Sequence, residues 1–102
     1  MNKTEQRYAE YLSGLIRAGE ILRFDFEPVK LRLAKSTFYT PDFRVITVDH
    51  YIQYHEVKGF WRDDARVKIK CAAEKHDCYQ FIAVQWVAKK KEWSREFFGW
   101  GD

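Results

Sequence analysis

The amino-terminal part of the chain repeats its apolar residues with the period of an α-helix. Thr4 is a suitable N-cap for such a helix. The apolar positions that follow it at helical spacing are Tyr8, Leu12, Leu15 and Ile16. Gly19 stands where a glycine commonly ends a helix. The pattern therefore predicts a helix over residues 4–18.

The pattern then changes to the two-residue alternation of β-strands. Residues 21–33 form the first predicted strand, in which Pro28 marks an edge or a bulge. Residues 38–48 and 51–57 follow as a second and a third strand. Because only Asp49–His50 separates them, we expect these two strands to form an antiparallel hairpin.

The second half of the chain returns to a helix and then to a strand. Asp63 or Asp64 caps a predicted helix that runs to about Lys75. Its apolar side is predicted to carry Val67, Cys71 and Ala72. A dense apolar run over residues 79–87 predicts a buried central strand. The tail, residues 89–98, is predicted to be helical.

These elements predict one domain over residues 1–102 in the order α-β-β-β-α-β-α. The order is typical of an α/β (α+β) fold with a mixed central sheet flanked by helices. A chain of 102 residues fits a single domain, and its 46% apolar and 18% aromatic residues argue against disorder. The net charge of +3 is compatible with a nucleic-acid partner but does not by itself favour one.

The ends and the cysteines suggest a cytoplasmic protein. We expect no secretory signal, because no apolar stretch follows the polar amino terminus. The longest apolar run, Phe81–Ala88, contains Gln85 and is far shorter than the roughly 20 residues that span a bilayer. Cys71 and Cys78 are too few for a disulfide framework. With His76 between them they raise the alternative of zinc, but a fourth ligand at close spacing is missing, so structural thiols are favoured.

Three charged residues of the predicted hairpin are placed to converge. Glu56 and Lys58 are two residues apart on one strand, so they point to the same side while Val57 points to the other. Asp42 lies on the partner strand and can come alongside them. Two carboxylates supply the hard oxygen ligands that Mg²⁺ prefers, and a neighbouring lysine can stabilise a hydroxide or a phosphoryl charge. The alternative is a surface charge ladder on an ordinary hairpin.

These residues carry a resemblance to a known superfamily. The matching residues are Pro41, Asp42, Glu56 and Lys58. They match the PD-(D/E)xK nuclease signature, and the chain looks most like the small bacteriophage Holliday-junction-resolving endonucleases. The resemblance runs over residues 3–87 and includes Tyr-Thr-Pro-Asp-Phe, ending at Phe43, and a Glu-x-Lys-Gly-aromatic-Trp stretch followed by two acids. It implies a restriction-endonuclease-like core, α-β-β-β-α-β, followed here by the predicted C-terminal helix.

The resemblance implies a Mg²⁺-dependent hydrolysis of DNA phosphodiester bonds, with Mn²⁺ as a substitute. Asp42 and Glu56, with the backbone carbonyl of Val57, would hold one Mg²⁺. Lys58 would orient or activate the attacking water. The family leaves a 5′-phosphate and a 3′-hydroxyl.

Family members usually place a further acid on the first helix, and the matching residue is Glu5. The helical pattern puts Glu5 on the face of Tyr8 and Leu12, which is turned towards the sheet. In that role Glu5 would help to hold a second metal ion. The alternative is an acid that simply complements the helix dipole, with Glu10 as the fallback candidate on a different face.

The helix after the Glu-x-Lys strand supplies the candidates for DNA binding. Because the family places this helix near its substrate, we expect phosphate contacts from Arg62, Arg66 and Lys70. The alternative is a solvated helix face. His55 is expected on the opposite face of its strand as a surface histidine rather than a phosphate contact. The aromatic tail is expected to pack on the sheet, with a dimer interface and a base-stacking wedge as alternatives.

The leading functional hypothesis is a Mg²⁺-dependent, structure-selective endodeoxyribonuclease of the phage Holliday-junction-resolvase type, in the cytoplasm of a host bacterium if it is phage-encoded. Its partners would be branched or junction DNA and a second copy of the chain, since a two-fold homodimer cuts two strands symmetrically. No dimerisation element is identified, however. The alternatives are a nicking or restriction-like nuclease on duplex DNA, a non-catalytic DNA-binding protein with a nuclease-like fold, and a protein-interaction module.

Overall fold

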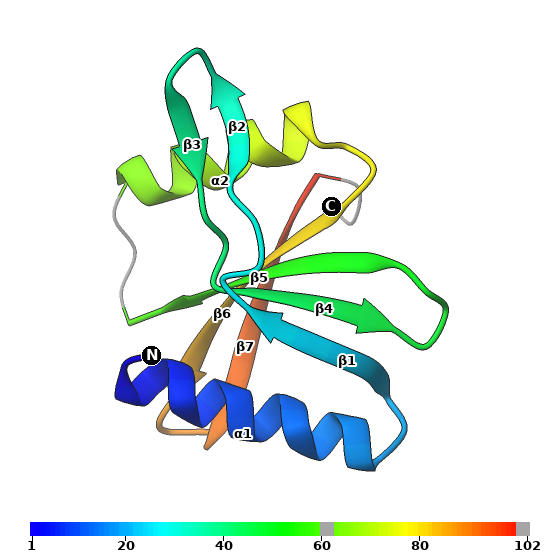
Figure 1. The fold of residues 1–102 in the computed structure, drawn as a ribbon. Coiled ribbons are helices and arrows are strands. Elements are labelled where there is room, and N and C mark those ends of the chain that lie inside the picture. Colours follow the sequence, from blue (N-terminus) through cyan, green and yellow to red (C-terminus); the bar gives the residue numbers. More distant parts are fainter. Residues whose placement is uncertain (60–62, 100–102) are drawn as a thin grey trace.

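The computed structural model describes residues 1–59 and 63–99. Figure 1 shows the helices and strands in these ranges. They are α1 (Lys3–Arg17), β1 (Ile21–Phe26), β2 (Leu31–Ala34), β3 (Thr37–Tyr39), β4 (Phe43–Thr47), β5 (Ile52–Lys58), α2 (Asp63–Lys75), β6 (Gln80–Val87) and β7 (Glu92–Phe98). The α+β class is confirmed.

Five of the strands form one mixed sheet in the order β1-β4-β5-β6-β7. β5 and β6 are parallel, with α2 between them in the chain, and the other neighbours are antiparallel. β2 and β3 form a separate two-stranded hairpin. In Figure 1, α1 lies on one side of the sheet, whereas α2 and the hairpin lie on the other. The predicted mixed sheet flanked by helices is therefore present.

Each face of the sheet has its own apolar core. The core under α1 contains Tyr8, Leu12, Ile21, Phe43, Val45, Ile82 and Val84. The core under α2 and the hairpin contains Leu31, Tyr39, Tyr54, Ile69, Ala72, Ala73, Phe81, Ala83 and Phe98. β6 contributes alternate residues to both cores, so it is buried on both faces, as the apolar run predicted.

The first helix begins at Lys3, one residue earlier than predicted, and its N-cap is Asn2 rather than Thr4. The Asn2 side chain accepts a hydrogen bond from the Glu5 N–H, and the Glu5 carboxylate accepts one from the Asn2 N–H, each at 2.8 Å. This reciprocal capping box satisfies two backbone donors at once. The end of the helix is confirmed, since Gly19 follows it with a φ of 76°.

The first long predicted strand is wrong, because residues 21–33 do not form one strand. β1 ends at Phe26, and Glu27, with a φ of 44°, then turns the chain before Pro28. The next strand belongs to the separate hairpin. The predicted strand over residues 38–48 is divided in the same way, since buried Pro41 lies between β3 and β4. The antiparallel hairpin of β4 and β5 is confirmed.

The predicted C-terminal helix is wrong, because β7 occupies that part of the chain. Lys91, with a φ of 52°, helps to turn the chain back onto β6. Trp93 then lies opposite Trp86, and Phe98 lies opposite Phe81. Pairing with β6 satisfies the backbone and brings the aromatic side chains against both cores, which outweighs the weak helical pattern. The tail packs on the molecule as predicted, but as an edge strand.

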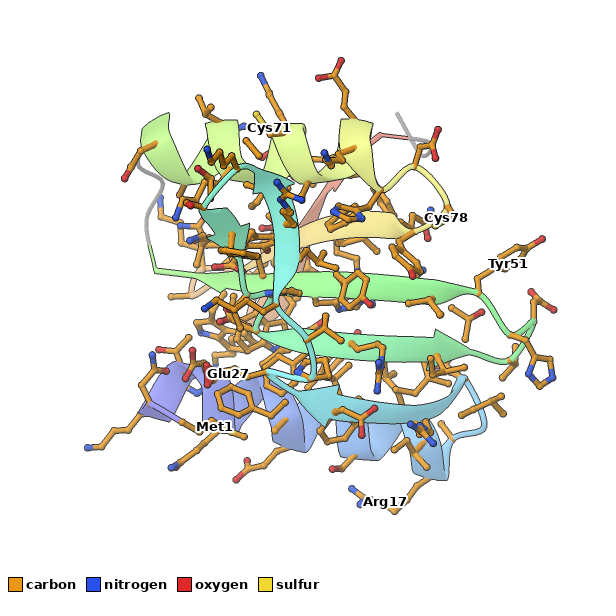
Figure 2. All side chains as sticks on the ribbon, turned by 45° about the horizontal axis from the view of Figure 1, so that its top comes forward. Met1, Arg17, Glu27, Tyr51, Cys71 and Cys78 are labelled. Carbon is orange, nitrogen blue, oxygen red and sulfur yellow. The ribbon has the colours of Figure 1, made fainter. Side chains whose placement is uncertain are left out.

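The apolar face of α2 also differs from the prediction. Val67 and Cys71 are exposed, whereas Ile69, Ala72 and Ala73 are buried at the helical spacing of three and four residues. Cys71 and Cys78 are free thiols at the surface rather than core residues (Figure 2). Neither α1 nor α2 has the length and apolar content to cross a membrane.

Candidate active site

Asp42 lies where the chain enters β4, and strand pairing sets its position. Phe43 is opposite His55 in the antiparallel pair of β4 and β5, so Asp42 comes level with Glu56. The Asp42 carboxylate accepts a hydrogen bond from the Val57 backbone N–H at 2.8 Å. The structure thus brings the two acids of the signature to the same end of the sheet.

Glu56 is held from two sides. One carboxylate oxygen, Oε1, accepts a hydrogen bond from the Tyr39 hydroxyl at 2.7 Å. The other oxygen, Oε2, lies 3.0 Å from Lys58 Nζ. The Glu56 and Lys58 side chains are only 13% and 19% exposed, so this ion pair is partly shielded from water. The carboxylate is therefore fixed in place rather than free to rotate.

Burial and the neighbouring acids raise the pKa of Asp42 to about 7. Burial is the main cause, and the charge of Glu56 comes next, while the Val57 N–H opposes them. Glu5 raises the pKa further and Lys58 lowers it. Burial and the two acids thus outweigh the Val57 N–H and Lys58 in their effect on the pKa of Asp42.

Glu5 lies near enough to Asp42 to act on its charge, but its carboxylate is engaged in the capping box of α1. Within residues 1–59 and 63–99, no group of three or more His, Cys, Asp or Glu side chains gathers as a metal site. The structure therefore pairs Asp42 with Glu56 and leaves Glu5 at the margin of the site. Glu10, the fallback acid, is exposed on α1.

The donor set fits a magnesium ion. Mg²⁺ in proteins is often held by only one or two carboxylates, with water and substrate phosphate completing its shell. Asp42 and Glu56 supply two such carboxylates, and a cation between them would relieve the repulsion that raises the pKa of Asp42. The residues that would hold it are Asp42, Glu56 and the backbone carbonyl of Val57.

A pocket of about 300 Å³ opens beside this cluster. Its lining residues are Phe38, Tyr39, Thr40, Glu56, Lys58, Ala65, Lys68 and Ile69. They come from the end of β3, from β5 of the main sheet and from α2, which lies on the same side of the sheet as β3 (Figure 1). Carboxylate and ammonium groups thus line a concave space that is open to a ligand.

The predicted DNA-binding residues of α2 do not face this pocket. Arg66 forms an ion pair with Glu96 of β7 at 2.5 Å. Lys70 lines a different cavity, of about 840 Å³, between α2 and β7. Arg62 lies outside the described residues. The α2 cation that does line the pocket beside Glu56 is Lys68, one position before the buried Ile69.

His55 is not the surface residue that its strand position predicted, because it is only 3% exposed. Its Nδ1 accepts a hydrogen bond from the Tyr8 hydroxyl at 2.5 Å, and its Nε2–H donates to Gln53 at 2.9 Å. Burial, followed by the charge of Arg95, lowers the pKa of His55 to about 3. A neutral histidine therefore ties β5 to α1 behind the acid cluster.

Tyr39 and Lys68 are the site residues that the sequence did not indicate. Tyr39 belongs to the Tyr-Thr-Pro-Asp-Phe string, but nothing in its spacing shows that its hydroxyl reaches Glu56. Its own strand is short and belongs to the separate hairpin, so the contact depends on how that hairpin folds over α2. The only sequence signal for Lys68 was its position next to Ile69 on the predicted helix. That signal could be used only if the buried face of α2 were already known.

No protein-family model, curated protein or solved structure matches the chain. The geometry of the acid cluster is therefore what carries a functional assignment.

Proposed function

We propose that the chain is a Mg²⁺-dependent endodeoxyribonuclease that hydrolyses DNA phosphodiester bonds. The observation that carries this proposal is the meeting of Asp42, Glu56 and Lys58 at one end of β4 and β5, beside an open pocket. Phosphodiester hydrolysis needs groups that compensate negative charge and a cation that attracts a phosphate. A metal ion held by Asp42 and Glu56 would meet the first requirement, and Lys58 supplies the cation for the second.

Each residue of the cluster has a separate role in this proposal. Asp42 and Glu56 hold the metal ion, which when bound supplies Lewis-acid stabilisation of the phosphate charge. Tyr39 positions Glu56 through the hydrogen bond to Oε1. Lys58 places a positive charge at the pocket, where it attracts the phosphate and orients the attacking water.

Within this class we favour branched DNA as the substrate and a Holliday-junction resolvase as the role. The support is the resemblance of the Tyr-Thr-Pro-Asp-Phe and Glu-x-Lys-Gly strings to phage resolvases. Symmetric cleavage of a junction requires two active sites, so this proposal includes a homodimer. Mn²⁺ is expected to replace Mg²⁺, because both are hard cations that take oxygen ligands.

The test is cleavage of supercoiled plasmid, a four-way junction and a linear duplex with Mg²⁺ or Mn²⁺ against an EDTA control. We expect Asp42→Asn, Glu56→Gln and Lys58→Met each to reduce the cleavage rate by about a hundred- to a thousandfold while DNA binding persists. Glu10→Gln and Lys75→Ala are the matched controls, since both residues are exposed and lie outside the cluster.

Full cleavage by the Asp42→Asn protein would overturn the nuclease proposal. DNA binding without metal-dependent cleavage would instead favour a non-catalytic DNA-binding protein. Equal affinity for the junction and the linear duplex would remove the resolvase role and leave a nicking or restriction-like nuclease.

A further inference from the structure

The β2–β3 hairpin is separate from the main sheet and has two unlike faces (Figure 1). On its inner face Leu31 lies opposite Tyr39, and both side chains are buried. On its outer face Arg32 lies opposite Phe38, and both side chains are exposed. Because strands alternate their faces, Lys30 lies on the same side as Arg32. The hairpin thus displays cations and an aromatic ring to solvent.

The hairpin and the residues next to it carry only positive charge. Residues 28–41 contain Lys30, Arg32 and Lys35 but no Asp or Glu. All three cations are exposed. Their sum equals the +3 net charge of the whole protein. A local excess of this kind attracts the phosphate backbone of a nucleic acid.

Phe38 connects this basic face to the catalytic pocket. Its side chain is 40% exposed and lines the same pocket as Glu56 and Lys58. Lys30 Nζ lies 5.0 Å from the centre of the Phe38 ring. An exposed aromatic ring among cations is the arrangement on which unstacked bases pack in proteins that bind single-stranded nucleic acids.

We propose that the outer face of the β2–β3 hairpin is the substrate-binding arm of the active site, a role that rests on the proposed nuclease function. Lys30 and Arg32 bind DNA phosphates, and Phe38 stacks on an unpaired base beside the phosphate to be cleaved. Lys68 flanks the same pocket from α2. The arm therefore selects DNA that has an unpaired or unstacked nucleotide at the cleavage site.

The inner face holds the arm in place independently of these side chains. Leu31 and Tyr39 belong to the core that packs under α2. The His76 ring nitrogen Nε2 donates a hydrogen bond to the Arg32 backbone carbonyl at 2.8 Å. Substitutions on the outer face remove side chains from solvent rather than from the core, so the variants below should fold.

The experiment measures DNA binding in the non-cleaving Asp42→Asn background with EDTA present. Fluorescence anisotropy compares a labelled duplex that contains a short unpaired bulge with a fully paired duplex of equal length. Phe38→Ala should weaken binding of the bulged duplex about five- to a hundredfold and change binding of the paired duplex by less than about twofold. Phe38→Tyr should restore binding, because it keeps the ring.

The phosphate contacts are tested through the salt dependence of the affinity. Lys30→Ala/Arg32→Ala should weaken binding of both DNAs and reduce the slope of log affinity against log salt by about two. The matched control is Arg17→Ala/Arg23→Ala, which removes the same charge from α1 and the β1 edge. Arg17 lies at the far end of α1 from the hairpin (Figure 2). The control should leave the slope unchanged.

The results separate this proposal from the nuclease function. The proposed substrate-binding arm is overturned if the hairpin variants bind DNA as tightly as the Arg17→Ala/Arg23→Ala control does. It is also overturned if Phe38→Ala weakens binding of the bulged and the paired duplex equally. If either of these binding results is found while the unsubstituted protein still cleaves plasmid with Mg²⁺, only the arm is overturned and the nuclease function stands. If the unsubstituted protein neither binds nor cleaves DNA, both the arm and the nuclease function are overturned.

Discussion

Replacing Asp42 by asparagine should stabilise the metal-free protein above pH 7, although Asp42 is proposed to be catalytic. Burial, followed by the charge of Glu56, raises the pKa of its carboxyl from 3.8 to about 7. A shift of one pKa unit corresponds to about 1.4 kcal/mol, so the ionised side chain destabilises the fold by on the order of 4 kcal/mol. Asparagine removes the charge and keeps an oxygen to accept the Val57 N–H.

The sign of the pH dependence follows from proton binding. Between pH 3.8 and about 7 the folded protein holds a proton on Asp42 that the unfolded chain has lost. The free energy of unfolding therefore falls as the pH rises through this window. Below the window both forms of the chain are protonated, and the advantage of Asp42→Asn should vanish there.

The assay is urea unfolding followed by tryptophan fluorescence in EDTA, at several pH values between about 4 and 8. Asp25→Asn is the matched control. The Arg44 guanidinium that hydrogen-bonds Asp25 lowers the pKa of that carboxyl, so the same substitution there should destabilise the protein at neutral pH. A gain in stability for Asp42→Asn that does not change with pH, or no gain at about pH 8, would show that ionised Asp42 does not destabilise the fold.

Four further outcomes are expected, for metal binding, the buried histidine, the tyrosine that contacts Glu56 and the last strand. Saturating Mg²⁺ should raise the melting temperature of the unsubstituted protein but not that of Asp42→Asn, as calorimetry would show. Because burial lowers the pKa of His55 to about 3, unfolding stability should fall as the pH drops below 6.5, and NMR should find its ring neutral at about pH 5. Tyr39→Phe should lower kcat more than it raises KM and reduce stability by about 1 kcal/mol in urea, because it removes a single hydrogen bond to Glu56. Phe98→Ala should lower the free energy of unfolding by about 3–5 kcal/mol in the same assay. If the last strand were frayed, the substitution would lower it far less.

The part of the site that could be predicted from the sequence is the part that depends on strand period. Glu56 and Lys58 share a side because strand residues alternate, and a short hairpin brings Asp42 level with them. These relations require only local geometry. The contact of Tyr39 with Glu56 depends on the packing of a separate hairpin against α2, which no local pattern encodes.

The errors in the fold have the same origin. Residues 92–98 became a strand because β6 offered an edge to pair with, and that edge is a tertiary feature. His55 became buried because the Tyr8 hydroxyl meets it from α1, nearly fifty positions away in the chain. A polar side chain that finds such a partner can occupy a position that its polarity alone would assign to solvent.

The acid cluster lies within one stretch of chain, which has a consequence for folding. Tyr39, Asp42, Glu56 and Lys58 all belong to residues 39–58, and the hydrogen bonds that join its strands span 17 and 15 residues. Closing loops of this length loses little chain entropy, so such contacts form early in folding. Repelling carboxylates would then come together early, and in the proposed nuclease a bound metal ion would lower their repulsion during folding as well as complete the site.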